Sequence, residues 1–152
     1  MGRIVVGVDG SEQSRATVAW ALAEARLRGA TLEAVCSYQV PSNWLGIGEG
    51  MGATMVLPIS DDEYADYAAT ALADVVNDVV GDDPGVEVVT TIKSGHAADV
   101  LVEVSKDADL LVVGIRGHHD LSRVLLGSVG MHCVHHAVCP VVVVRGNDDL
   151  AS

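Results

Sequence analysis

The sequence contains no phenylalanine, and Phe, Trp and Tyr together make up only 3% of its 152 residues. A core built around large aromatic rings is therefore excluded, and valine, leucine, isoleucine and alanine must supply most of the buried surface. Hydrophobic residues still amount to 49% of the chain, which excludes an intrinsically disordered protein. Short runs rich in valine favour the strands of a buried parallel sheet. The length suits one domain with its own core.

Basic residues are also scarce, since 9 Lys and Arg stand against 21 Asp and Glu and give a net charge of −12. Binding to nucleic acid or to an anionic membrane surface needs a basic footprint, so we expect neither kind of partner. We also expect no membrane span and no signal peptide, because every apolar run is short. Cys36, Cys133 and Cys139 show no spacing typical of a disulfide framework, and this predicts a cytoplasmic location.

Apolar runs alternate with segments of helical periodicity along the whole chain. We expect strands at 3–8, 31–37, 86–92, 109–113 and 141–144, each of the first four followed by a helix. This alternation predicts an α/β fold with one open five-stranded parallel sheet and helices on both faces. The domain is expected to span residues 1–146, with 147–152 as a C-terminal tail.

The helices carry further signals in their spacing and at their ends. Ser11 is the expected N-cap of the first helix, and Asp61 or Asp62 that of the second. The apolar residues expected on the buried face of the first helix are Ala16, Ala19, Trp20, Ala23 and Leu27.

A glycine pattern, G-x2-G-x9-G-S, follows the expected fourth strand and leads into the last helix. It consists of Gly114, Gly117, Gly127 and Ser128. Glycines let the backbone approach an anion closely, and N–H groups at a helix N-terminus can bind it. The Ser128 hydroxyl can donate one more hydrogen bond. Ordinary strand–helix turns are the alternative, but the spacing favours a phosphate site.

Asp9 stands at the end of the first expected strand, where parallel sheets hold ligands if the winding reverses there. If the first and fourth strands are neighbours, Asp9 and Gly114 face the same crevice. The alternative for Asp9 is a simple helix cap. Arg116 and Arg123 can be read equally well as phosphate ligands or as surface residues.

These residues resemble the universal stress protein family over almost the whole chain. Residues 4–11 resemble the opening strand and turn of the family, and residues 139–144 resemble its closing strand. Residues 109–114, together with the glycine pattern, resemble the ATP-binding branch of the family. The resemblance implies the strand order 3-2-1-4-5, which makes the first and fourth strands neighbours.

The resemblance also implies a ligand, which is ATP with or without Mg²⁺. Asp9 matches the acidic residue that bonds the ribose, and Val8 and Ser37 match backbone positions along the adenine. The phosphate cradle is matched by Gly114, Gly117, Gly127, Ser128 and Val129. A homodimer through Val141–Val144 is implied as well, and an all-valine edge strand needs such cover in any case.

Three departures from the family pattern are visible, and one of them is that His118 and His119 occupy a loop that is often basic or glycine-rich. Ile115 stands where a small polar residue is frequent, so one phosphate contact is absent there. Gly130 replaces a frequent Ser or Thr.

The last helix gathers histidine and cysteine. His132 and His136 are four residues apart, a spacing that can ligate a metal, and His135 and Cys139 share that spacing. The alternative, which we favour, is a partly exposed helix that packs through Val134 and Val138. We therefore expect no metal site.

No pattern for catalysis accompanies the glycine motif. The chain lacks a Walker lysine motif, a G-x-S-x-G elbow and an H-E-x-x-H pair. The sequence thus predicts a nucleotide-binding regulatory protein of the stress response, whose bound ATP changes a dimer surface or the loop at 38–60. Slow ATP hydrolysis remains open. The alternative is the same fold that binds cyclic AMP, or no nucleotide, and acts through protein–protein contacts.

Overall fold

The computed structural model describes residues 2–39, 60–115 and 126–146. In chain order the elements are β1 (Arg3–Gly7), α1 (Glu12–Arg28), β2 (Thr31–Tyr38), α2 (Asp61–Val80), β3 (Val88–Ser94), α3 (Ala97–Val104), the 3-10 turn η3 (Ser105–Asp107), β4 (Leu110–Gly114), α4 (Ser128–His136) and β5 (Val141–Val144). The expected tail at 147–152 and most of the loop at 38–60 lie outside the described residues, and the domain boundary at 146 stays a prediction.

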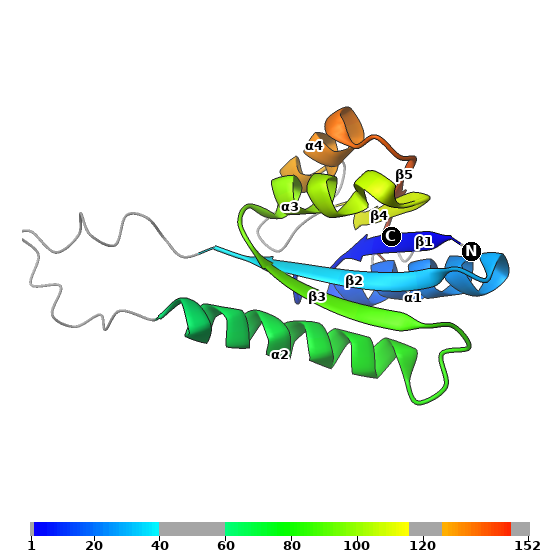
Figure 1. The fold of residues 1–152 in the computed structure, drawn as a ribbon, viewed down its shortest axis with the longest axis horizontal. Helices are drawn as coiled ribbons and strands as arrows, with labels where there is room; N and C mark the ends of the chain where they lie inside the picture. The colour runs from blue at the N-terminus through cyan, green and yellow to red at the C-terminus, as the bar shows by residue number, and fades with distance from the viewer. Residues whose placement is uncertain (1, 40–59, 116–125, 147–152) are drawn as a thin grey trace, which may run out of the picture.

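All five strands pair in parallel in the order β3-β2-β1-β4-β5, which confirms the order implied by the resemblance. Figure 1 shows α1 and α2 on one face of this sheet and α3 and α4 on the other. The two layers enclose two apolar clusters, one on each side of the sheet. No described helix has the length and apolar character that a membrane span requires.

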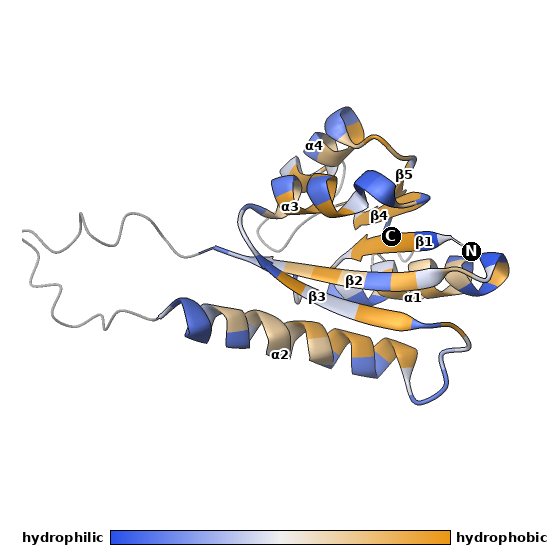
Figure 2. Cartoon of the chain, viewed as in Figure 1, coloured by the Kyte–Doolittle hydropathy of each residue, from blue (hydrophilic) through white to orange (hydrophobic). Residues whose placement is uncertain are grey.

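The central strands are apolar without interruption because both of their faces are covered. Ile4, Val5 and Val6 of β1 are fully buried, and so are Leu111 and Val112 of β4. Side chains alternate between the two faces of a strand, so a strand covered on both faces needs an apolar residue at every position. Figure 2 shows this concentration of hydrophobic residues in the sheet.

The predicted buried face of α1 is wrong. Trp20 is 37% exposed and Leu27 is 83% exposed. The residues that α1 buries are Ser14, Thr17, Val18, Ala21, Leu22 and Ala25. Small side chains let this helix lie close to the sheet, and its two buried hydroxyls find local hydrogen-bond partners. Apolar spacing therefore predicted the wrong side of α1, because the large residues Trp20 and Leu27 lie on its exposed side.

The helix caps also differ from expectation. Ser11 does stand at the N-cap position of α1, but its hydroxyl makes no capping bond and donates to Asp9 Oδ1 at 2.6 Å. Helix α2 begins after Ser60, whose hydroxyl accepts a hydrogen bond from the N–H of Glu63 at 3.2 Å. Serine followed three residues later by glutamate is the capping-box spacing, so Ser60 precedes the expected Asp61 or Asp62.

Candidate functional site

A crevice opens at the carboxyl ends of β1 and β4, at the centre of the sheet. Its walls come from the ends of β1, β2 and β4 and from the first turns of α1, α3 and α4. The chain leaves β1 towards one face through α1 and leaves β4 towards the other face through α4 (Figure 1). The connections therefore diverge at this point and leave the strand ends uncovered, which is where open α/β sheets hold ligands.

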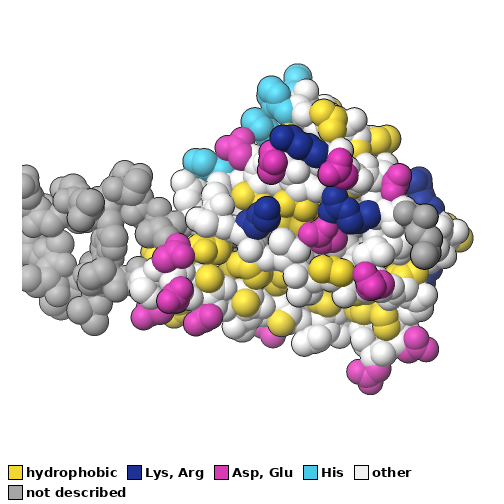
Figure 3. Space-filling model, in the orientation of Figure 1, with side chains coloured by type: hydrophobic (Ala, Val, Ile, Leu, Met, Phe, Trp, Pro, Cys, Tyr) yellow, Lys and Arg dark blue, Asp and Glu magenta, His cyan; other side chains and the backbone are white. Residues whose placement is uncertain are grey.

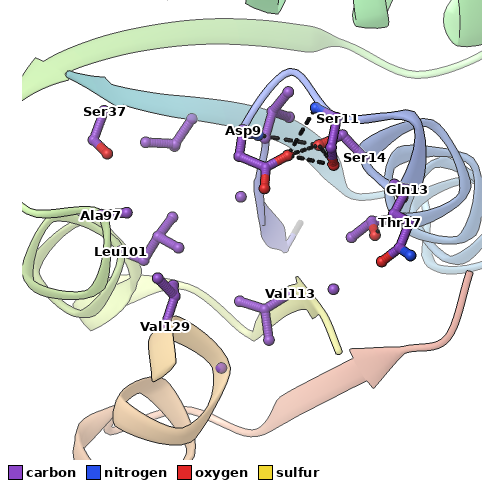
Figure 4. A pocket seen from close by; sticks show the side chains of 15 residues that line it. Asp9, Ser11, Gln13, Ser14, Thr17, Ser37, Ala97, Leu101, Val113 and Val129 are labelled. Atoms are coloured by element: carbon purple, nitrogen blue, oxygen red, sulfur yellow. Dashed lines mark hydrogen bonds between the residues drawn. The ribbon is translucent and has the colours of Figure 1, made fainter. Parts of the chain in front are cut away.

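Asp9 lies at the mouth of this crevice and is held by three donors on one oxygen. Its Oδ1 accepts hydrogen bonds from the Ser11 N–H at 2.9 Å, the Ser11 hydroxyl at 2.6 Å and the Ser14 hydroxyl at 2.5 Å. The Asp9 N–H donates to Ser14 Oγ at 3.0 Å. Gly10 bends the chain into α1 with a φ of 84°, a conformation that suits glycine. Figure 4 shows this group of hydrogen bonds beside the open space.

Most of the residues singled out in the sequence meet around this crevice. Its walls include Val8, Asp9, Ser37, Gly114 and Val129. The first and fourth strands are thus neighbours, and the two halves of the predicted site come from segments about a hundred residues apart.

The other three predicted residues belong to the glycine motif. Gly127 is the buried N-cap of α4, and Ser128 is the exposed first residue of that helix; neither is among the residues that line the crevice. Gly117 lies outside the described residues, as do Arg116 and Arg123.

The first turn of α4 reaches the crevice through Val129 and Gly130. Among the residues that the structure describes, no side chain caps this helix start, so its first N–H groups and its dipole favour an anion there. Packing favours glycine at position 130, because a Cβ there would lie 2.7 Å from Leu126 Cδ1. A serine or threonine would therefore displace Leu126.

The crevice is also lined by residues that the sequence patterns did not assign to a site, and those on the helices α1 and α3 are Gln13, Ser14, Thr17, Ala97 and Leu101. One signal for two of them was present. Ser14 and Thr17 are polar residues that fall on the buried side of an otherwise apolar helix. Ala97 and Leu101 carry no such signal, because alanine and leucine are ordinary helix residues.

Two thiols are buried deeply enough to be inert near neutral pH. Burial, helped by the negative charge of Asp9, raises the pKa of Cys36 from 9.0 to about 11. Burial likewise raises the pKa of Cys133 from 9.0 to about 11. Thiolates are the reactive form, so neither residue is a candidate nucleophile.

These pKa values predict a loss of stability in alkali. An unfolded thiol ionises near pH 9, whereas the folded thiols hold their protons to about pH 11, so the free energy of unfolding falls as the pH rises between these values. The loss is on the order of 2 kcal/mol for each thiol. Urea denaturation at pH 8 and pH 10.5 measures it. Cys36→Ala should show a smaller drop than the wild type, whereas Cys139→Ala should keep most of it. Equal drops in all three proteins would contradict the prediction.

The histidines of α4 lie on the surface, where Figure 3 shows them gathered over one end of the molecule. His132 Nε2 lies 3.3 Å from Asp99 Oδ1, and the rings of His132 and His136 are 4.4 Å apart between centroids. Within the described ranges, no three His, Cys, Asp or Glu residues gather closely enough to hold a metal ion. The packing expectation for α4 is wrong, since Val134 is 50% and Val138 is 73% exposed. The helix packs through Cys133 and Gly130 instead.

Taken together, the sheet order and the central crevice define a doubly wound α/β protein with a ligand-type opening between β1 and β4. A family model described as the universal stress protein family matches residues 1–145, and the chain belongs to this family.

Similar proteins agree with this assignment. The chain is 41% identical over 150 residues to a universal stress protein of Mycolicibacterium smegmatis, which covers 97% of this chain and 49% of the relative. It is 33% identical over 148 residues to one from Mycobacterium tuberculosis, with 97% and 48% covered. The chain thus spans about half the length of the curated relatives it matches.

Two solved structures share the fold. The universal stress protein UspA of Lactobacillus plantarum superposes with a TM-score of 0.73 at 24% identity, covering 95% of this chain and 97% of that one. A universal stress protein in complex with cAMP superposes with a TM-score of 0.69 at 27% identity, covering 96% and 98%.

Proposed function

We propose that this protein binds an adenine nucleotide in the crevice between β1 and β4, that the nucleotide is ATP, and that the bound state regulates a partner in the stress response. The observation that carries the proposal is the crevice itself, which brings an acidic residue at the end of β1 opposite an uncapped helix start after β4. A related universal stress protein has been solved with cAMP, a ligand that shares adenine and ribose with ATP.

Each part of a nucleotide has a counterpart in this arrangement. The Asp9 carboxylate can accept hydrogen bonds from ribose hydroxyls. Val8 and Ser37 border the end of the crevice assigned to adenine. Gly114, the start of α4 and the glycine at position 117 are assigned to the phosphates, with or without Mg²⁺.

A homodimer through β5 forms part of the proposal. β5 stands at one end of the sheet, and its four valines are only half-buried in the single chain. An apolar edge strand invites pairing with another strand. The net charge of −12 argues against nucleic acid as a partner, and a cytoplasmic location remains the expectation.

Cyclic AMP is the second candidate ligand, because the solved relative with that ligand is 27% identical over nearly the whole chain. A chain that binds no nucleotide and acts only through protein contacts is the third candidate. Slow ATP hydrolysis would be added to the first candidate if a water molecule reaches the terminal phosphate.

Titration calorimetry of ATP, ADP, AMP and cyclic AMP into nucleotide-free protein tests the proposal. We expect ATP to bind, and Asp9→Ala to weaken it at least about tenfold, because hydrogen bonds to a charged group contribute about 1.5–3 kcal/mol. The matched control is Asp107→Ala, which removes the same charge from an exposed turn just before β4. This turn lies at the amino end of the strand, whereas the crevice lies at the carboxyl ends.

Each other outcome selects a different function. Binding of cyclic AMP alone would support the second candidate and contradict the phosphate assignment. No binding by a cooperatively folding protein would reject nucleotide binding altogether. An equal loss in Asp9→Ala and Asp107→Ala would mean that charge in general, and not Asp9, governs affinity.

A further inference from the structure

We infer that Ser14 is the positioning residue of this site: it orients the Asp9 carboxylate so that the ribose hydroxyls can bind to it. The inference rests on the proposed function and adds to it a residue that acts through its hydrogen bonds to Asp9. Its role would be to set how well the protein distinguishes a ribose from a sugar without free hydroxyls.

The Ser14 hydroxyl makes its two shorter hydrogen bonds with Asp9, and it also lies 3.5 Å from the Ser11 hydroxyl. The hydroxyl donates to Asp9 Oδ1 at 2.5 Å and accepts from the Asp9 N–H at 3.0 Å. It therefore links the side chain of Asp9 to its own backbone and fixes the side-chain torsion between them. Figure 4 shows Asp9 Oδ1 facing Ser11 and Ser14 at the start of α1, with the carboxylate beside the open space of the crevice.

Ser11 reinforces the same arrangement from a weaker position. Its N–H and hydroxyl also reach Asp9 Oδ1, but Ser11 is at the edge of the helix and is only half-buried. Ser14 is 4% exposed and sits on the face of α1 that packs against the sheet. A group fixed by its surroundings loses little freedom when it holds a neighbour, so Ser14 is the better anchor.

Serine at this position acts on Asp9 rather than on the helix as such. Alanine has the higher helix propensity and buries no polar group, but it would make neither of the hydrogen bonds that the Ser14 hydroxyl shares with Asp9. Alanine does occupy positions 21 and 25 on the same face. At position 14 a buried hydroxyl is present instead, and it bonds to Asp9, the acidic residue among the described residues that line the crevice.

The test compares ATP with 2′,3′-dideoxy-ATP, which lacks both ribose hydroxyls, by titration calorimetry. We expect the wild type to prefer ATP. Ser14→Ala should weaken ATP about tenfold and dideoxy-ATP less than about twofold, because only the ribose contact depends on the orientation of Asp9. Ser105→Ala is the matched control: Ser105 is fully buried and donates to the Val102 carbonyl at 3.2 Å, away from the crevice, so both affinities should stay unchanged.

The outcomes separate this inference from the function beneath it. If neither ligand binds to the wild type, both the proposed function and the proposed role of Ser14 are rejected. If both bind equally well, the ribose contact of Asp9 is wrong. If Asp9→Asn removes the preference for ATP and Ser14→Ala retains it in full, only the role of Ser14 is overturned. An equal loss of both ligands in Ser14→Ala would show a structural role and would also overturn it.

Discussion

Leu111→Ala is expected to lower the free energy of unfolding by about 2–5 kcal/mol, because it removes a large, fully buried side chain and leaves a cavity in the core. Leu111 is fully buried in β4, where it pairs with Val5 on one side and Val141 on the other. It belongs to the apolar cluster between the sheet and the α3–α4 layer, which also contains Leu101 and Cys133. Urea denaturation followed by circular dichroism measures the change.

Leu27→Ala is the matched control, since it makes the same substitution at a residue that is 83% exposed. Its free energy of unfolding should differ from the wild type by less than about 0.5 kcal/mol. If Leu27→Ala destabilises the protein as much as Leu111→Ala, then Leu27 is buried, and α1 packs on the sheet through the face that apolar spacing predicted. The pair therefore tests both the core and the orientation of α1.

The strands were predictable because their signal is local. Residues such as Val5, Val6 and Leu111 are buried whichever face they point to, so a continuous apolar run identifies a central strand without knowledge of its neighbours. The order of the strands is a different matter. Nothing in an apolar run says which strand lies beside it, and the order that the structure confirms came only from the resemblance to a family.

Helix α1 shows where local reasoning fails. Its sequence is rich in alanine on every side, so apolar spacing has no unique direction, and Trp20 and Leu27 dominated the pattern. The face that packs on the sheet is instead the one with small residues, including Ser14 and Thr17. Their burial is possible only because hydrogen-bond partners are nearby, and such partners cannot be read from periodicity.

Some residues of the candidate site were likewise visible in the sequence, and others could be found only in the structure. Asp9 and Gly114, which line the crevice, could be singled out because strand ends and glycine spacing are visible in the sequence. Ala97 was missed because its place in the site depends on α3 beginning beside the end of β2, a relation that only the folded chain provides. Ala97, found only by structure, borders the space proposed for the base together with Val8 and Ser37, whereas Asp9 and Gly114 are proposed to bind sugar and phosphate.

That division leads to a substitution at the base end of the crevice. Ala97→Trp is expected to weaken every adenine nucleotide by more than about 100-fold, because the indole ring would occupy the space assigned to adenine. Ala97 is half-buried in the first turn of α3 and lies on the same side of the crevice as Ser37 (Figure 4). Ala19→Trp is the matched control, since it adds the same ring at an exposed position of α1.

Calorimetry with ATP and cyclic AMP, together with thermal unfolding, gives the decisive comparison. Ala97→Trp should weaken the binding of ATP and of cyclic AMP to the same degree, because both carry adenine. The variant should still unfold cooperatively. Asp9→Ala should cost ATP more than cyclic AMP, because the 3′ oxygen of cyclic AMP is esterified and cannot donate a hydrogen bond. Wild-type affinity in Ala97→Trp would place the nucleotide elsewhere on the protein. Loss of ATP alone would mean that position 97 borders the phosphates, and that the nucleotide lies in the crevice in the reverse direction.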